Sequence, residues 1–197
     1  KALSIAEAIS PSILWIDEIE KGLSGIESSG VTDAGTSARV FGTILTWMQE
    51  KEKPVFVVAT ANNIENLPPE LLRKGRFDEI FFVDLPGRES RKDIWRIHLR
   101  KRLKEKRYQE HLKYLDMDRL VELTKGFSGA EIEEALNEAL YGAYYDNKET
   151  LSMEYLEKAI KETYPLSKIM GEVVLSLRRW AKVRARRASN EEPEEMG

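Results

Sequence analysis

The sequence lacks cysteine, long apolar runs and an excess of charge of either sign. Without cysteine, disulfides and thiolate metal sites are excluded, which suits a reducing cytoplasm. No apolar run approaches the ~20 residues needed to cross a bilayer, and the N-terminal residues are too polar for a signal peptide. The 31 basic and 34 acidic residues give a net charge of −3, which argues against gross nucleic-acid affinity. We therefore expect a cytoplasmic protein with neither a membrane nor a nucleic acid as its partner.

The sequence does contain enough apolar material for a core. Apolar residues make up 42% of the 197, a length that suits one substantial domain or two small ones. The chain opens without Met and in the middle of a helical pattern. We therefore expect it to be a piece of a longer protein.

An apolar run that ends in two carboxylates is the first candidate site. Residues 13–16 (ILWI) predict a short strand buried on both faces, and Asp17 and Glu18 follow it. Ligands bind at the carboxyl ends of strands in open parallel sheets, where one acid can reach a hydrated Mg²⁺ and the next can activate water. This arrangement resembles the Walker B pattern of P-loop NTPases. Taken alone, the stretch also fits a buried strand followed by an acidic helix cap.

A second strand and an arginine pair add to this site. Residues 55–59 predict a strand, and Asn62 and Asn63 follow it, where an amide could position a water or a phosphate oxygen. A turn or capping asparagine is the alternative. Arg73 and Arg76 flank a glycine in a predicted turn, and two guanidinium groups there suit the γ-oxygens of a triphosphate. Surface ion pairs would explain one of these arginines more readily than both.

The rest of the sequence predicts helices and one more strand. Two prolines favour a short helix over 70–73, and glycine and serine mark 22–36 as a mobile loop. Ser128 and Glu131 predict a capping box. The charged residues from 178 onward are expected to be solvated and partly disordered. The other expected elements are a strand over 79–83 and helices over 36–50, 88–107, 117–125, 129–146, 152–163 (capped by Ser152) and 166–183.

Together these motifs resemble the AAA ATPase family, in the order in which that family has them. Residues 13–18 are similar to Walker B, and Asn62 falls where the family has sensor 1, counting back from residues 75–78 (GRFD). Residues 126–132 (GFSGAEI) are similar to the sensor-2 segment of the lid.

The resemblance implies a role for each matching residue. Asp17 would hold the water shell of Mg²⁺, Glu18 would be the general base, and Asn62 would position the lytic water. Arg73 and Arg76 would be arginine fingers that act on the nucleotide of a neighbouring subunit. His98 would contact the sugar of the nucleotide, and Gly129 and Ala130 would pack near its adenosine.

The resemblance narrows to the stand-alone AAA proteins of cyanobacteria, red-algal plastids and other bacteria. It rests on segments such as 18–21 (EIEK), 46–50 (TWMQE) and 69–79 (PELLRKGRFDE). One departure matters: no Gly-x-x-x-x-Gly-Lys-Ser/Thr occurs in the 197 residues, so the phosphate-binding loop and its lysine are missing from this chain. In the family's strand order this leaves a gap beside the 55–59 strand, with unpaired backbone.

We expect an α/β fold, namely the carboxyl half of an AAA large subdomain, with a parallel sheet and helices, followed by an all-helical lid. The expected divisions are a nucleotide-binding part (1–86), a lid (87–164), and an extension with a charged tail (165–197). The parent protein is expected to be an Mg²⁺-dependent ATPase that binds ATP, forms a homo-oligomeric ring, by resemblance a hexamer, and remodels a macromolecule such as a protein. This chain alone is expected to be inactive.

Two other functions remain open. The chain could be a non-catalytic binding module that pairs with another chain through its lid helices. It could also bind nucleic acid weakly through residues 178–187, which hold six bases. Binding of that kind should weaken steeply with salt, whereas nucleotide binding should require Mg²⁺.

Overall fold

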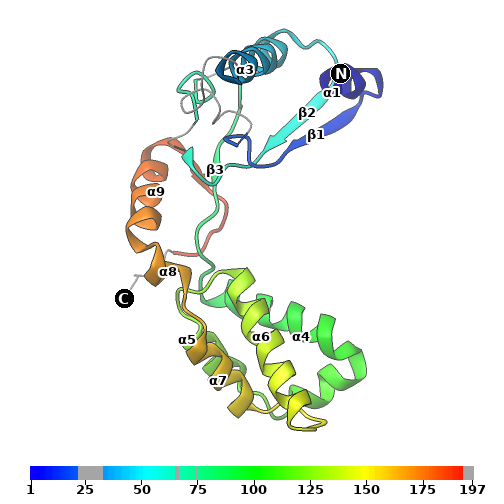
Figure 1. The fold of residues 1–197 in the computed structure, drawn as a ribbon, viewed down its shortest axis with the longest axis vertical. Coiled ribbons are helices and arrows are strands. Elements are labelled where there is room, and N and C mark those ends of the chain that lie inside the picture. The colour runs from blue at the N-terminus through cyan, green and yellow to red at the C-terminus, as the bar shows by residue number, and fades with distance from the viewer. Residues whose placement is uncertain (22–32, 65–66, 74, 193–197) are drawn as a thin grey trace. The chain divides into compact units, whose positions relative to one another are not determined.

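The computed structural model describes residues 1–21, 33–64, 67–73 and 75–192, and the chain divides into two compact units (Figure 1). The first unit is Lys1–Ile80 and the second is Phe81–Gly197. Each unit has a hydrophobic cluster of its own. The predicted division after residues 86 and 164 remains a prediction.

A two-stranded parallel sheet is the centre of the first unit. Strand β1 (Ser12–Ile16) pairs with β2 (Val55–Ala59), so that Ile16 lies opposite Ala59. Parallel strands need a crossover connection, and helix α3 (Asp33–Glu50) lies within it. Among the described residues β2 pairs with β1 alone, so its other edge carries no strand there. That edge is the one predicted to be unpaired.

Helices α1 and α3 are anchored to this sheet by apolar packing and two side-chain hydrogen bonds. Leu45 of α3 belongs to a buried cluster against which Ile16 and Ala59 pack. Helix α1 (Ala2–Ala8) is joined to α3 by a 3.0 Å hydrogen bond from Trp47 Nε1 to Glu7 Oε1. Ser12 Oγ donates to the carbonyl of Ala6 at 2.7 Å, which fixes the end of α1 to the start of β1. These contacts hold the two strands, and with them the residues at their carboxyl ends, in a fixed position relative to α1 and α3.

Three expectations for the first unit are wrong. The apolar run was expected to be buried on both faces, but Ile13 and Trp15 are 72% and 60% exposed, because the described residues cover only one face of the sheet. The short helix expected over 70–73 is a series of turns, since the hydrogen bonds there span three residues. Helix α3 begins at Asp33, within the predicted loop, and residues 22–32 of that loop lie outside the described residues.

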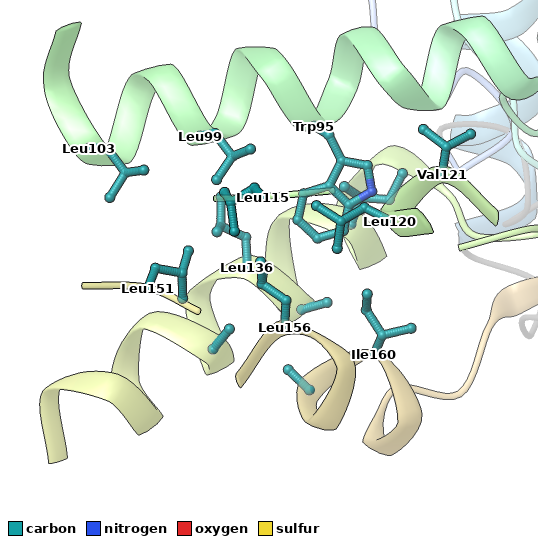
Figure 2. Packing of buried hydrophobic residues seen from close by; sticks show 14 of the residues in the cluster. Trp95, Leu99, Leu103, Leu115, Leu120, Val121, Leu136, Leu151, Leu156 and Ile160 are labelled. Atoms are coloured by element: carbon teal, nitrogen blue, oxygen red, sulfur yellow. The ribbon is translucent and has the colours of Figure 1, made fainter. Parts of the chain in front are cut away.

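Four helices surround the core of the second unit (Figure 2). The four helices are α4 (Arg88–His111), α5 (Met117–Leu123), α6 (Gly129–Tyr145) and α7 (Met153–Glu162). Trp95 and Leu99, which belong to helix α4, are fully buried and face Leu136 and Leu156. The indole Nε1 of Trp95 donates to Thr124 Oγ1 at 3.2 Å, so its polar atom is satisfied inside the core.

The helix boundaries test the predicted caps. The capping box is confirmed: the Ser128 backbone N–H donates to Glu131 Oε2, and the Glu131 N–H donates to Ser128 Oγ. Ser152 does occupy the N-cap of α7, but its side chain makes no capping hydrogen bond. Helix α4 runs past residue 107, with one residue, Lys104, in a non-helical conformation (φ 57°, ψ 162°).

The C-terminal part was expected to be solvated and partly disordered; most of its described charged residues are exposed, but the segment up to residue 192 has defined structure. Strand β4 (Arg186–Arg187) pairs in parallel with β3 (Phe81–Phe82), so the unit is not wholly helical, and β3 is shorter than the predicted strand. Glu191 Oε1 accepts the N–H of Ser90 at 2.9 Å, in the first turn of α4. That turn starts from a glycine with no capping side chain, and a carboxylate is favourable at such a helix end.

The single helix expected over 166–183 is two helices, α8 (Leu166–Ile169) and α9 (Gly171–Arg184). Arg178 of α9 forms an ion pair with Asp84, with Nε 2.9 Å from Oδ2, and both side chains are mostly buried. The predicted charged tail is therefore partly used for internal contacts. Within the described ranges, no helix is long and apolar enough to cross a membrane.

Candidate functional site

The carboxyl ends of β1 and β2 bring together the acidic pair and the asparagine expected from the sequence. The backbone pairing continues beyond the strands, because the N–H of Ile19 donates to the carbonyl of Thr60 at 2.9 Å. This holds Asn62 beside the acids, and its Nδ2 donates to Glu18 Oε1 at 3.1 Å. Thr60 Oγ1 donates to Asp17 Oδ1 at 2.5 Å and accepts the N–H of Glu18 at 2.9 Å. Each carboxylate is thus oriented from the neighbouring strand.

Glu18 has the least ordinary backbone of the group. Its φ of 48° lies in the left-handed region, which a non-glycine residue enters at some cost and which is concentrated at functional sites. Lys21 Nζ lies 2.7 Å from Glu18 Oε2, and this hydrogen bond, with the charge of Glu18, raises the pKa of Lys21. A carboxylate offers about four acceptor positions, so Asn62 and Lys21 leave Glu18 able to accept a further hydrogen bond.

Glu20 is a site residue that the sequence reasoning missed. Its side chain is only 4% exposed, and Oε1 accepts the backbone N–H of Asn62 at 2.9 Å. Its Oε2 is buried and has no hydrogen-bond partner among the described residues. Thr60 was missed as well. Both act through β1–β2 pairing, and the only sequence signal was their position just past two predicted strands.

Arg73 and Arg76 lie on the turn that was predicted for them. Gly75, between them, has φ 92°, a conformation that favours glycine. Arg73 is exposed, whereas Arg76 is partly buried and its Nη1 donates to the carbonyl of Glu70. Within the described part of this unit, neither guanidinium bonds to Asp17 or Glu18. The structure therefore leaves their assignment as arginine fingers a prediction.

The lid residues expected to contact nucleotide lie in the second unit, on neighbouring faces of α4 and α6. His98 Nδ1 is buried and 3.4 Å from Glu133 Oε1, without the geometry of a hydrogen bond. Desolvation raises the pKa of Glu133, but His98, Lys101 and Arg102 outweigh it, so the pKa is lowered and Glu133 stays ionised.

Gly129 and Ala130 begin α6. A Cβ on Gly129 would lie 3.7 Å from Ile94 Cδ1, so this end of α6 sits directly against α4. Ala130 is exposed in the first turn. His98, Gly129 and Ala130 therefore lie where α4 and α6 pack against each other.

The donor atoms of the acidic group fit Mg²⁺. This ion is usually held by one or two carboxylates together with waters and substrate phosphates, and Asp17 is an exposed carboxylate. Among the described residues, no three His, Asp or Glu side chains converge into a dedicated metal cage. The chain can therefore contribute one or two metal contacts, and its 197 residues contain no phosphate-binding loop motif.

Comparison with known proteins identifies the class. Residues 1–85 match the ATPase family associated with various cellular activities (AAA), and residues 115–158 match the AAA+ lid domain. The chain belongs to the AAA family. The crystal structure of the FIGL-1 AAA domain in complex with ADP superposes with a TM-score of 0.73 at 20% identity, covering 93% of this chain and 61% of that one. This confirms the predicted α/β AAA fold with a helical lid.

Particular relatives refine the assignment. The AAA domain-containing protein ycf46 of Pyropia yezoensis is 52% identical over 95% of this chain and 37% of its own length. The ycf46 protein of Trieres chinensis is 45% identical over 91% of this chain and 34% of its length. The proteasome-activating nucleotidase of Sulfurisphaera tokodaii is 36% identical over 82% of this chain and 40% of its length. The resemblance to stand-alone AAA proteins is confirmed, and the chain spans little more than a third of these relatives.

Proposed function

We propose that this chain is the Walker B, sensor-1 and lid portion of an Mg²⁺-dependent ATPase. The observation that carries the proposal is the contact between Glu18 and Asn62. A carboxylate in a left-handed backbone conformation, oriented by an amide from the next strand, is suited to take a proton from water. The AAA family membership supports ATP as the nucleotide.

Each residue of the acidic group has a distinct task in this proposal. Asp17, oriented by the Thr60 hydroxyl, would contact the water shell of Mg²⁺, which when bound supplies positive charge to the phosphates. Glu18 would accept the proton of the attacking water. Asn62 would hold the Glu18 carboxylate and the water in one arrangement. Arg73 and Arg76 would act on the nucleotide of a neighbouring subunit.

The macromolecular task is proposed from the relatives. ATP-dependent zinc metalloprotease FtsH of Karelsulcia muelleri is 36% identical over 73% of this chain, and the proteasome-activating nucleotidase is similarly related. Both names describe nucleotide-driven proteins associated with proteolysis. We propose that the full-length protein couples ATP hydrolysis to remodelling of a macromolecule, in a homo-oligomeric ring. Its cytoplasmic location remains a prediction.

Removing Mg²⁺ should abolish ATP hydrolysis by the full-length protein. The phosphates then lose the ion that Asp17 helps to hold, and excess EDTA should reduce phosphate release to background, with recovery on adding Mg²⁺.

The 197-residue chain alone should neither hydrolyse ATP nor bind it tightly, because it lacks the phosphate-binding loop. Phosphate release and calorimetric titration measure the two effects. Full activity in EDTA, or micromolar binding by the chain alone, would contradict the proposal.

Glu20 is expected to act as a positioning residue for this reaction. Glu20→Ala removes the acceptor for the Asn62 backbone N–H, and the displaced amide should lower kcat about 10- to 100-fold with little change in KM. Glu20→Gln keeps a carbonyl acceptor and should retain most of the activity. Steady-state kinetics of the full-length protein measure both, and thermal unfolding confirms that each variant folds. An unchanged kcat in Glu20→Ala, or equal losses in both variants, would remove this role.

A further inference from the structure

The C-terminal ends of α4 and α6 carry a concentration of positive charge that the proposed ATPase role does not use. Residues 100–107 contain six bases and one acid. Three of these bases are paired: Arg100 with Glu105, and Lys101 and Arg102 with Glu133. The other three, together with one base after α6, are exposed and form no ion pair within the described ranges: Lys104, Lys106, Arg107 and Lys148.

Two of these four cations line one hollow. Arg107 of α4 and Lys148 border an open cavity of about 200 Å³, together with the ring of Tyr144. Glu149 is the only acidic residue among those that line it. The cavity lies about 22 Å along α6 from Gly129, at 1.5 Å per residue, so it is distinct from the lid residues expected to contact the ATPase nucleotide.

Hydrogen bonds through His111 hold the two sides of the hollow together. His111 Nε2 accepts the backbone N–H of Leu151 at 3.1 Å, and its Nδ1 donates to the carbonyl of Arg107 at 2.7 Å. The imidazole is buried, so it joins the last turns of α4 to the segment that follows Lys148. The cations are thereby placed by a fixed backbone, which lowers the entropy lost when a ligand binds.

The Tyr144 ring that lines the hollow belongs to a group of three exposed tyrosines on α6. Tyr144 and Tyr145 are 83% and 86% exposed, and Tyr141, one turn earlier on the same face of α6, is exposed as well. Exposed apolar side chains that form a contiguous patch are typical of an interaction surface. A nucleobase has a flat face that stacks on such a ring, whereas the carboxylates of an acidic peptide do not.

The basic segment singled out in the sequence is a poorer candidate. Arg178 is paired with Asp84, Arg187 with Glu192, and the guanidinium of Arg184 lies over the Trp180 ring, 5.9 Å from its centroid. At least three of the segment's six bases are therefore engaged within the chain, whereas Lys104, Lys106, Arg107 and Lys148 form no ion pair among the described residues. The ends of α4 and α6 are therefore a better candidate for a positively charged binding surface than residues 178–187.

We propose that the hollow between the ends of α4 and α6 binds single-stranded nucleic acid. Arg107 and Lys148 contact consecutive phosphates, and an unpaired base stacks on Tyr144. A single strand fits better than a duplex, because paired bases do not expose their faces to a side chain. Lys104 and Lys106 extend the positive surface beyond the space that one nucleotide fills, which favours a strand over a free nucleotide.

Fluorescence anisotropy of a labelled 20-nucleotide oligothymidylate, titrated with the 197-residue chain, tests this. Four phosphate contacts give a slope of about −2.8 in log K against log salt, or about a 50-fold loss of affinity from 50 to 200 mM KCl. Arg107→Gln with Lys148→Gln should reduce the slope to about −1.4. The matched control is Arg179→Gln with Lys182→Gln, which removes the same charge from exposed positions of α9 and should leave the slope unchanged.

The aromatic contact has its own variants. Tyr144→Leu should weaken binding about 5-fold or more, while Tyr144→Phe keeps the stacking ring and should bind like the parent chain. Tyr164→Leu, at an exposed tyrosine that does not line the hollow, is the control. The proposal is overturned if no salt-dependent binding occurs, or if the α9 control loses as much as the hollow variant. It is equally overturned if Tyr144→Leu binds normally and polyglutamate of equal charge competes fully, because the surface would then fit an acidic protein segment.

Discussion

Glu18→Gln should stop ATP hydrolysis by the full-length protein while leaving ATP bound. Gln keeps the size of the side chain and can still meet Asn62, but it cannot accept the proton of the attacking water. Loss of a general base typically lowers the rate about 10²- to 10⁴-fold. The nucleotide-binding contacts are not altered, so the protein should be recovered with ATP instead of ADP. Phosphate release and chromatography of the bound nucleotide measure the two effects.

Two control variants separate the loss of the proton acceptor in Glu18→Gln from the loss of a negative charge. Glu52→Gln makes the same replacement at an exposed glutamate between α3 and β2 and should have normal turnover. The lost Lys21 ion pair is a second consequence of Glu18→Gln, and Lys21→Ala removes that pair while keeping the carboxylate. If Lys21→Ala were as inactive as Glu18→Gln, the ion pair and not proton transfer would explain the loss. Undiminished turnover in Glu18→Gln would remove it from the base role.

Local sequence signals predicted most of the secondary structure. The apolar runs within 12–16 and 55–59 form strands, because their β-branched and aromatic side chains suit a pleated surface. The apolar spacing that predicted the lid helices corresponds to the face that buries Trp95, Leu99 and Leu136. The capping box at the start of α6 was predictable because both partners are three residues apart.

Contacts between distant segments were not predictable in the same way. The charge of the C-terminal segment indicated a solvated tail, but Arg178 pairs with Asp84, 94 residues earlier. Strand β4 has no apolar pattern of its own and forms because β3 offers a partner edge. Its arginines remain exposed, so neither burial nor periodicity marks it in the sequence.

The candidate site was predictable where it depends on strand ends. Asp17, Glu18 and Asn62 each follow an apolar run, and parallel pairing of those runs brings them to one edge. Glu20 was not predictable, because a glutamate just after a strand is usually exposed, and its burial depends on the backbone of Asn62. Thr60 likewise acquires its role only through the register that sets it against Asp17.

Arg73→Ala should lower ATP turnover by roughly 10³ to 10⁵, the range in which arginine fingers act in other NTPases, with little effect on nucleotide binding. Arg73 is the cleaner probe of the two arginines because its side chain is exposed. Arg76 also donates to the Glu70 carbonyl, so Arg76→Ala should lower turnover and loosen the turn as well. Measuring turnover and nucleotide affinity for each variant separates an effect on catalysis from an effect on binding. Lys53→Ala, which removes a positive charge from an exposed position, is the control.

Mixing variants tests whether the arginines act across a subunit boundary. A ring that contains Glu18→Gln and Arg73→Ala subunits includes interfaces where an intact Glu18 faces an intact Arg73 from its neighbour. Such a ring should regain part of the activity that both variants lack alone. If the arginine served the nucleotide of its own subunit, each subunit would keep one defect and no mixture would recover. The absence of recovery, in rings shown by labelled subunits to have exchanged, would place Arg73 in the same active site as the Glu18 of its own chain.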